Sequence, residues 1–111
     1  MPASVKDGGE EGGCLVYVRM VDLKGRRLVA VCDEEILGKT FREGRLRLEV
    51  SEQFYKGMLT SMDEAVKLVS DADIANLAGR SIVDAVLRQG LADQRAVITV
   101  SGIPHLQILR F

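Results

Sequence analysis

Residues 14–33 read CLVYVRMVDLKGRRLVAVCD, and this stretch decides the fold class. Its two halves, 14–22 and 27–32, are rich in Val, Leu and Tyr, which are residue types that favour β-strands. The sequence LKG at 23–25 is typical of a tight turn, because Gly supplies the positive φ that such turns require. We therefore expect an antiparallel hairpin at the start of the folded region.

The chain continues outward from the hairpin as short helices and strands. Asp33 is followed by two Glu residues, which is typical of the capped start of a short helix that ends near Gly38. The segment RLRLEV (45–50) alternates strictly between charged and apolar side chains, so it predicts a strand with one face toward solvent. Ser51 and Gly57 bracket a turn that carries two aromatic residues.

The second half of the chain is read as helices followed by strands. Two capping boxes, at 61–64 and 81–84, each predict the start of an amphipathic helix. Between them, DIANLAG (73–79) is interpreted as a short helical piece. AVITV (96–100) is continuously apolar, which is typical of a central strand, and HLQILRF (105–111) predicts a last strand. This order predicts an α+β fold, a mostly antiparallel or mixed sheet with helices packed on one face.

Composition divides the chain into a tail and one domain. Residues 1–13 hold four Gly, four charged side chains and few apolar groups, so we expect a flexible Gly-rich tail. Residues 14–111 then form a single α+β domain. No apolar run approaches the roughly 20 residues that span a bilayer, and the start of the chain lacks the apolar core of a signal peptide. We expect a cytoplasmic protein without a membrane partner.

Charge and cysteine content exclude several classes of site. The net charge is −1, from 15 basic and 16 acidic residues, so nucleic-acid binding would need a local basic patch. The spacing of Cys14 and Cys32 excludes a CxxC metal site. The predicted hairpin places Cys32 opposite Val16 or Tyr17, which leaves Cys14 out of disulfide reach. We expect no disulfide, no metal site and no tightly bound cofactor.

One basic cluster stands out in the sequence. It consists of Lys39, Arg42, Arg45 and Arg47. Arg45 and Arg47 are expected on the same face of one strand, about 7 Å apart, which is similar to the spacing of phosphates along a nucleic-acid strand. Tyr55, if exposed, would add base stacking, whereas Phe41 is more readily interpreted as buried. The alternative is a solvated face on which Glu43 and Glu49 pair with the basic side chains.

A second set of candidates is polar within apolar surroundings. It consists of Cys32, Asn76, His105 and Gln107. Cys32 and His105 could form a nucleophile–base pair, and the two amides could read a ligand or a base edge. The alternative is that Cys32 is a small core residue, that His105 belongs to a turn, and that the amides close hydrogen bonds within the fold.

Four segments, in the same order along the chain, resemble an archaeal family catalogued as domain of unknown function 424. They are VCDEEILGKTF (31–41), SEQFY (51–55), ADIANL (72–77) and GIPHLQI (102–108). The resemblance implies an archaeal, cytoplasmic protein and brings no known activity. Members tend to be encoded near translation-related genes, which favours a role with RNA or the ribosome. The long acidic tail departs from the usual short start of that family.

Three functions remain open at this point. The leading hypothesis is a non-catalytic RNA- or ribosome-associated module that uses the basic cluster. The second is a small ligand-binding protein or enzyme built around Cys32, Asn76 and His105. The third is a protein-interaction module that uses the C-terminal strand as an edge, which would also allow a homo-oligomer to form.

Overall fold

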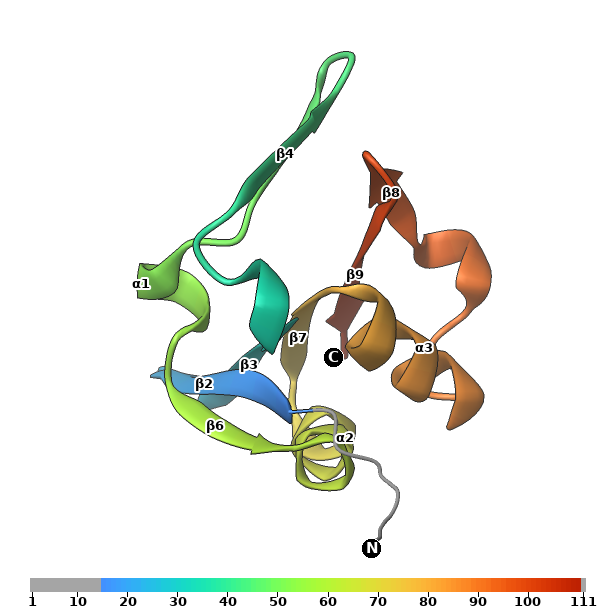
Figure 1. Cartoon of the computed structure of the whole chain (residues 1–111). Coiled ribbons are helices and arrows are strands. Elements are labelled where there is room, and N and C mark those ends of the chain that lie inside the picture. Colours follow the sequence, from blue (N-terminus) through green and yellow to red (C-terminus); the bar gives the residue numbers. More distant parts are fainter. Residues whose placement is uncertain (1–14, 111) are drawn as a thin grey trace, which may run out of the picture.

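The computed structural model describes residues 15–110, and a six-stranded sheet organises them (Figure 1). Its strands are β2 (Leu15–Leu23), β3 (Arg26–Asp33), β6 (Met58–Ser61), β7 (Ile74–Ala78), β8 (Ile98–Val100) and β9 (Ile103–Leu109). Their order across the sheet is β6-β2-β3-β7-β9-β8. Strands β3 and β7 run parallel, and the other neighbouring pairs are antiparallel. The predicted α+β class with a mixed sheet is confirmed.

The hairpin at the start of the sheet forms as expected. Strands β2 and β3 are joined by Lys24 and Gly25, whose φ angles of 54° and 87° are those of the two-residue turn that matches strand twist. Tyr17 lies opposite Cys32, which is one of the two predicted registers. Cys14 and the tail predicted over residues 1–13 lie outside the described residues.

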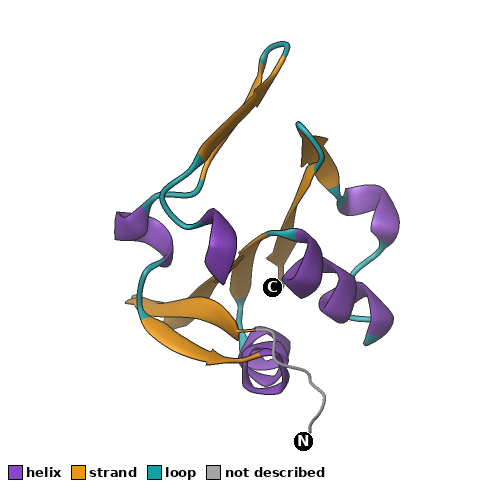
Figure 2. Cartoon of the chain, in the orientation of Figure 1, coloured by secondary structure: helices purple, strands orange, loops and turns teal. Residues whose placement is uncertain are grey.

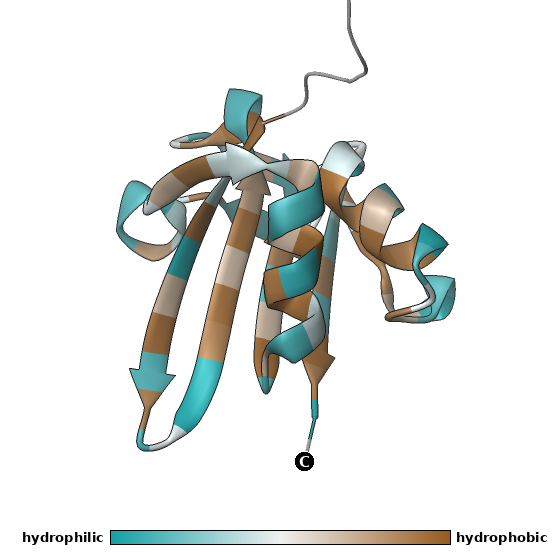
Figure 3. Cartoon of the chain, turned by 90° about the horizontal axis from the view of Figure 1, so that it is seen from below, coloured by the Kyte–Doolittle hydropathy of each residue, from teal (hydrophilic) through white to brown (hydrophobic). Residues whose placement is uncertain are grey.

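The two longer helices, α2 (Met62–Asp71) and α3 (Arg80–Arg88), cover one face of the sheet. Helix α2 begins at the predicted capping box, where the Ser61 hydroxyl accepts from the Glu64 N–H at 3.2 Å. In the view from below, α2 lies over the strands (Figure 3). Apolar side chains of both helices pack on the strands and form the larger core. Along residues 15–110, no helix is long and apolar enough to cross a membrane.

The second face of the sheet is covered by shorter elements. The 3-10 helix η1 (Glu34–Ile36), the single turn α1 (Glu52–Tyr55) and the base of a separate hairpin pack there (Figure 2). Ala30, Ala78 and Val100 contribute the sheet side of this smaller core. The longer helices therefore share one face as predicted, and the short ones lie on the other face.

Two of the elements predicted from the sequence were wrong. Residues 73–79 were expected to be helical, but most of them form strand β7 between β3 and β9. Ala and Leu favour helices, but burial between two strands outweighs that preference. The run at 96–100 was expected to be a central strand, but it supplies the short edge strand β8, preceded by the 3-10 helix η2 (Gln94–Ala96). An apolar run alone does not distinguish central from edge positions.

A second hairpin projects from the body (Figure 1). It consists of β4 (Thr40–Glu43) and β5 (Leu46–Glu49), and we call it the β4–β5 arm. Gly44, with φ of 60°, occupies the first position of its two-residue turn. The loop between β8 and β9 contacts the arm. The Ser101 N–H donates to a Glu43 carboxylate oxygen at 2.7 Å, and the Ser101 hydroxyl donates to the Arg42 carbonyl at 3.1 Å.

Candidate functional site

The β4–β5 arm carries three of the four predicted basic residues. Arg42 and Arg47 are direct cross-strand partners, Arg45 lies in the turn, and Lys39 immediately precedes β4. All four are exposed. The sequence placed Arg45 and Arg47 on one strand face, but the strand begins only at Leu46, so the side chain beside Arg47 is that of Arg42.

The pairing of Arg42 with Arg47 brings like charges together. In a two-residue hairpin the residues that flank the turn exchange hydrogen bonds, so the next pair along is of the non-hydrogen-bonded type. The Cα atoms of such a pair lie about 4.5 Å apart, and their side chains approach closely. Like charges in directly opposite positions destabilise a hairpin. The arm thus concentrates positive charge at a cost to its own stability.

Acidic side chains of the arm neutralise only part of this charge. Glu49 forms an ion pair with Arg47 at 3.3 Å, in which both side chains are more than half exposed. Such a surface pair contributes at most about 1 kcal/mol. Glu43 accepts the Ser101 N–H. The arm and Lys39 together therefore present four basic side chains against two acidic ones.

The aromatic candidates are buried or half-buried. Tyr55 is only 3% exposed, and burial, with a contribution from Cys32, raises the pKa of its hydroxyl to about 12. Its ring meets Phe54 edge to face, with 4.9 Å between the centroids. Phe41 is half-buried against the smaller core, as expected. Tyr55 therefore does not offer a ring face to a base, and the condition attached to its predicted stacking role is not met.

Cys32 and His105 share a sheet face but do not meet. Tyr17, Cys32, Ala78 and His105 form one row across four strands, so Ala78 separates the thiol from the imidazole. Two strand spacings correspond to about 10 Å. Cys32 is fully buried, and burial, with the nearby Asp33 and Glu35 carboxylates, raises its pKa to about 12. Burial lowers the pKa of His105. This arrangement holds a protonated thiol away from its proposed base.

The two amides occupy the next row of the same face. Asn76 and Gln107 are cross-strand partners, and the Gln107 amide donates to the Asn76 side-chain oxygen at 3.0 Å. The hydrogen bond between them agrees with the structural alternative for these residues. Asn76 is half-buried and Gln107 is exposed, so neither lies in a closed pocket.

The C-terminal strand β9 is only partly an edge. Strand β8 covers it from Ile103 to His105. Within residues 15–110, no strand pairs with Gln107 or Leu109 on the side of β9 that faces β8, and Leu109 is 58% exposed. Partner binding or self-association through this strand stays a prediction.

Sequence reasoning missed the role of Asp33. This residue is 2% exposed, and its carboxylate accepts from the Ser81 N–H at 2.8 Å and the Ile82 N–H at 3.0 Å. It therefore caps α3 and not η1, for which it makes no side-chain bond. The second capping box was wrong, because α3 begins after Gly79 and Ser81 is within its first turn. Burial raises the pKa of Asp33, and the two N–H donors oppose that shift.

The Asp33 carboxylate also decides what α3 can bind. A helix N-terminus is a general anion site, because its first N–H groups have no partner in the helix. Here the chain's own carboxylate occupies two of those groups. Gly79 has φ of 120° and ψ of 151°, and an added Cβ would lie 2.4 Å from the Asp33 Cγ. The closeness of Gly79 and Asp33 leaves no room there for a phosphate.

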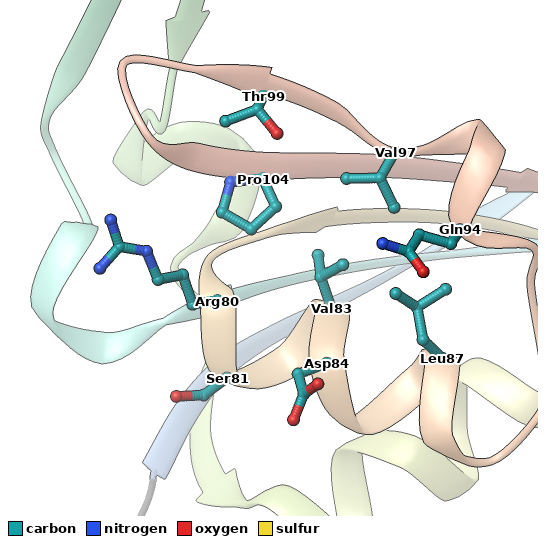
Figure 4. A pocket seen from close by; sticks show the side chains of 9 residues that line it. All are labelled: Arg80, Ser81, Val83, Asp84, Leu87, Gln94, Val97, Thr99 and Pro104. Carbon is teal, nitrogen blue, oxygen red and sulfur yellow. The ribbon is translucent and has the colours of Figure 1, made fainter.

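An open groove of about 600 Å³ lies between α3 and the β8–β9 hairpin. Its apolar lining consists of Val83, Leu87, Val97 and Pro104, and its polar lining includes Arg80, Gln94 and Thr99. In Figure 4, Val83 and Leu87 rise from α3 toward the strands, whereas Ser81 and Asp84 point away from them. No sequence signal indicated this groove, because its two walls come from segments that only the fold brings together.

Metal ligands do not gather in the part of the chain that the structure describes. Over residues 15–110 there is no group of three or more His, Cys, Asp or Glu side chains placed to hold an ion.

Comparison with known proteins identifies similar chains without an assigned activity. The model of the family described as "Protein of unknown function (DUF424)" matches residues 22–111. A crystal structure described as that of an uncharacterized conserved protein from Methanopyrus kandleri is also similar, with a TM-score of 0.70 and 26% sequence identity. The likeness covers 87% of this chain and 94% of that one. No curated protein matches.

Proposed function

The chain belongs to the DUF424 family, whose description names no activity, so we infer its function from its own side chains. We propose that it is a non-catalytic module that binds RNA through the β4–β5 arm. The observation that carries this proposal is the placement of Arg42 directly opposite Arg47 on an exposed, projecting hairpin. A polyanion on that face would turn an unfavourable like-charge pair into two favourable contacts.

Several features favour a phosphate backbone as the polyanion. Guanidinium groups form bidentate bonds with phosphate, and three of the four basic side chains are Arg. The arm is a two-stranded ribbon, an element narrow enough to follow a nucleic-acid groove or strand. The body is not basic, since the whole chain has a net charge of −1, so only the local patch would attract RNA. We take the ribosome as the first RNA-containing partner to test.

The proposal is tested by removing the opposed pair. The arm variant carries Arg42→Ala and Arg47→Ala, and the control variant carries Arg88→Ala and Arg95→Ala. The control removes the same charge from exposed positions in surface ion pairs elsewhere on the molecule. If each lost contact releases the counterions of one single-strand phosphate, the arm variant binds RNA about 10-fold more weakly near 200 mM salt and about 70-fold more weakly near 50 mM salt.

Fluorescence anisotropy with single-stranded ribosomal RNA fragments and sedimentation with small ribosomal subunits measure these affinities. We expect the control variant to stay within about twofold of the wild type, because Arg88 and Arg95 lie outside the arm. Equal losses of RNA affinity in the two variants would show that the effect comes from net charge alone, and would overturn the role of the arm. If the wild-type protein binds neither RNA nor subunits at 50 mM salt, the RNA function is wrong.

A further inference from the structure

The groove between α3 and the β8–β9 hairpin lies next to the point where the arm is held. Arg80 donates from its Nε to the Gly102 carbonyl at 3.1 Å, and the preceding residue, Ser101, donates to the Arg42 carbonyl at 3.1 Å. One peptide unit therefore separates the contact with Arg80 from the contact with the arm. Arg80 is exposed, and its terminal nitrogens make no hydrogen bond within residues 15–110.

We propose that this groove holds one unpaired nucleotide of the RNA strand that the arm binds, with its phosphate at Arg80 and its base between α3 and the hairpin. The proposal deepens the RNA function and rests on it. It adds a second contact point and a preference for single-stranded RNA, which an arm that contacts only phosphates would not have.

The shape and lining of the groove fit a base. Its volume of about 600 Å³ falls within the range of small-ligand sites. Leu87 on α3 faces Val97 and Pro104 across it, and these three side chains are partly exposed, so a flat base would have apolar surface on both sides (Figure 4). Val83 also lines the groove but is only 2% exposed. Burying the faces of a base in this way removes apolar area from water.

The polar groups of the groove fit the edge of a base and a phosphate. The Thr99 hydroxyl and the Gln94 amide are exposed neutral groups, and neither makes a side-chain hydrogen bond within residues 15–110. Between them they supply donors and acceptors of the kind that read exposed base edges. Arg80 supplies the positive charge for the phosphate at the end of the groove nearest the arm. Asp84 also lines the groove, but its carboxylate points away from the strands (Figure 4).

The test compares one short RNA as a single strand and as a blunt duplex. Thr99→Trp fills the groove from an exposed position on an edge strand, where an aromatic residue suits strand geometry. Met58→Trp, at an exposed position on the opposite edge strand β6, is the matched control. Arg80→Gln, with Arg88→Gln as its control on the same helix, removes the phosphate contact without filling the groove.

We expect the wild type to prefer the single strand by about fivefold, at the low end of what one stacked base contributes. Thr99→Trp should abolish this preference and leave duplex affinity unchanged, and Met58→Trp should keep it. Arg80→Gln should reduce the salt slope on single strands by about 0.7, whereas Arg88→Gln should not. If folded Thr99→Trp protein keeps the single-strand preference, or Arg80→Gln behaves as its control does, the groove does not bind the nucleotide.

A titration with adenosine 5′-monophosphate separates the two proposals. Methyl NMR signals of Val83, Leu87 and Val97 should shift at millimolar nucleotide, and the shifts should be lost in Thr99→Trp. If the wild type binds RNA through the arm and these methyl groups do not shift, the groove inference alone is wrong. If no RNA binds, the RNA function is wrong, and the groove inference fails as stated because the strand that it requires is absent.

Discussion

Removal of the Asp33 carboxylate should destabilise the protein far more than removal of a comparable surface cap. Asp33→Ala leaves the Ser81 and Ile82 N–H groups without their acceptor, at a residue that is 2% exposed. A lost helix cap costs about 0.5–2 kcal/mol, and each buried donor left without a partner costs about 1–3 kcal/mol. Allowing for overlap between these contributions, we expect a loss of about 3 kcal/mol, which lowers the thermal midpoint by about 12–24 °C.

Asp93→Ala is the matched control, because Asp93 also accepts a backbone N–H at the start of a short helix but does so in solvent. Its loss should cost less than about 0.5 kcal/mol, since water replaces the acceptor. Urea denaturation followed by circular dichroism measures both variants. If the two losses are equal, the bonds from Ser81 and Ile82 to Asp33 do not stabilise α3 more than an exposed cap would.

The pH dependence of Asp33 has a definite sign. Because burial raises its folded-state pKa, the part of its contribution that depends on protonation is full below the unfolded pKa and is lost as the pH rises through the folded pKa. The stability of the wild type relative to Asp33→Asn, which cannot ionise, should therefore fall as the pH rises from the unfolded-state pKa to the folded-state pKa of Asp33. A relative stability that rises with pH would contradict the inferred shift.

Three further outcomes follow from the described geometry. Gly79→Ala should lower the free energy of unfolding by about 3 kcal/mol, since a φ of 120° suits only Gly and the new Cβ would contact Asp33. The loss should be smaller in Asp33→Ala protein, and strict additivity in a double-mutant cycle would refute the contact. His105 is the single histidine, so its NMR titration is unambiguous; burial predicts a midpoint below 6.5, and one at or above that value would contradict the burial. In a Cys14→Ser variant, native Cys32 should resist thiol reagents until the protein unfolds, and fast labelling of the folded protein would show that the thiol is accessible.

Local sequence patterns predicted the elements that local chemistry determines. The β2–β3 hairpin follows from a two-residue turn at Lys24 and Gly25, and the start of α2 follows from the hydroxyl of Ser61. Both depend on residues only a few positions apart. The register of Tyr17 with Cys32 follows from the same turn, because pairing outward from it leaves little freedom.

Features that depend on long-range contacts could not be predicted in this way. Strand β7 looked helical because Ala and Leu favour helices. It forms a strand because it is buried between β3 and β9, and neither strand is close to it in the sequence. Asp33 was assigned to the helix that follows it, whereas its carboxylate bonds residues 48 and 49 positions away. Within the candidate site, the basic residues could be identified from their density in the sequence. The pairing of Arg42 with Arg47 could not, because β4 is too short and polar to be recognised as a strand.

RNA binding by the arm is tested most directly by the salt dependence of affinity for single-stranded RNA. The slope of log affinity against log salt should be shallower by about 1.4 for the Arg42→Ala, Arg47→Ala variant than for the wild type, because each phosphate contact on a single strand contributes about 0.7. The Arg88→Ala, Arg95→Ala control should keep the wild-type slope. An arm variant with the slope of the wild type would show that Arg42 and Arg47 do not neutralise phosphates, and would contradict the proposed function.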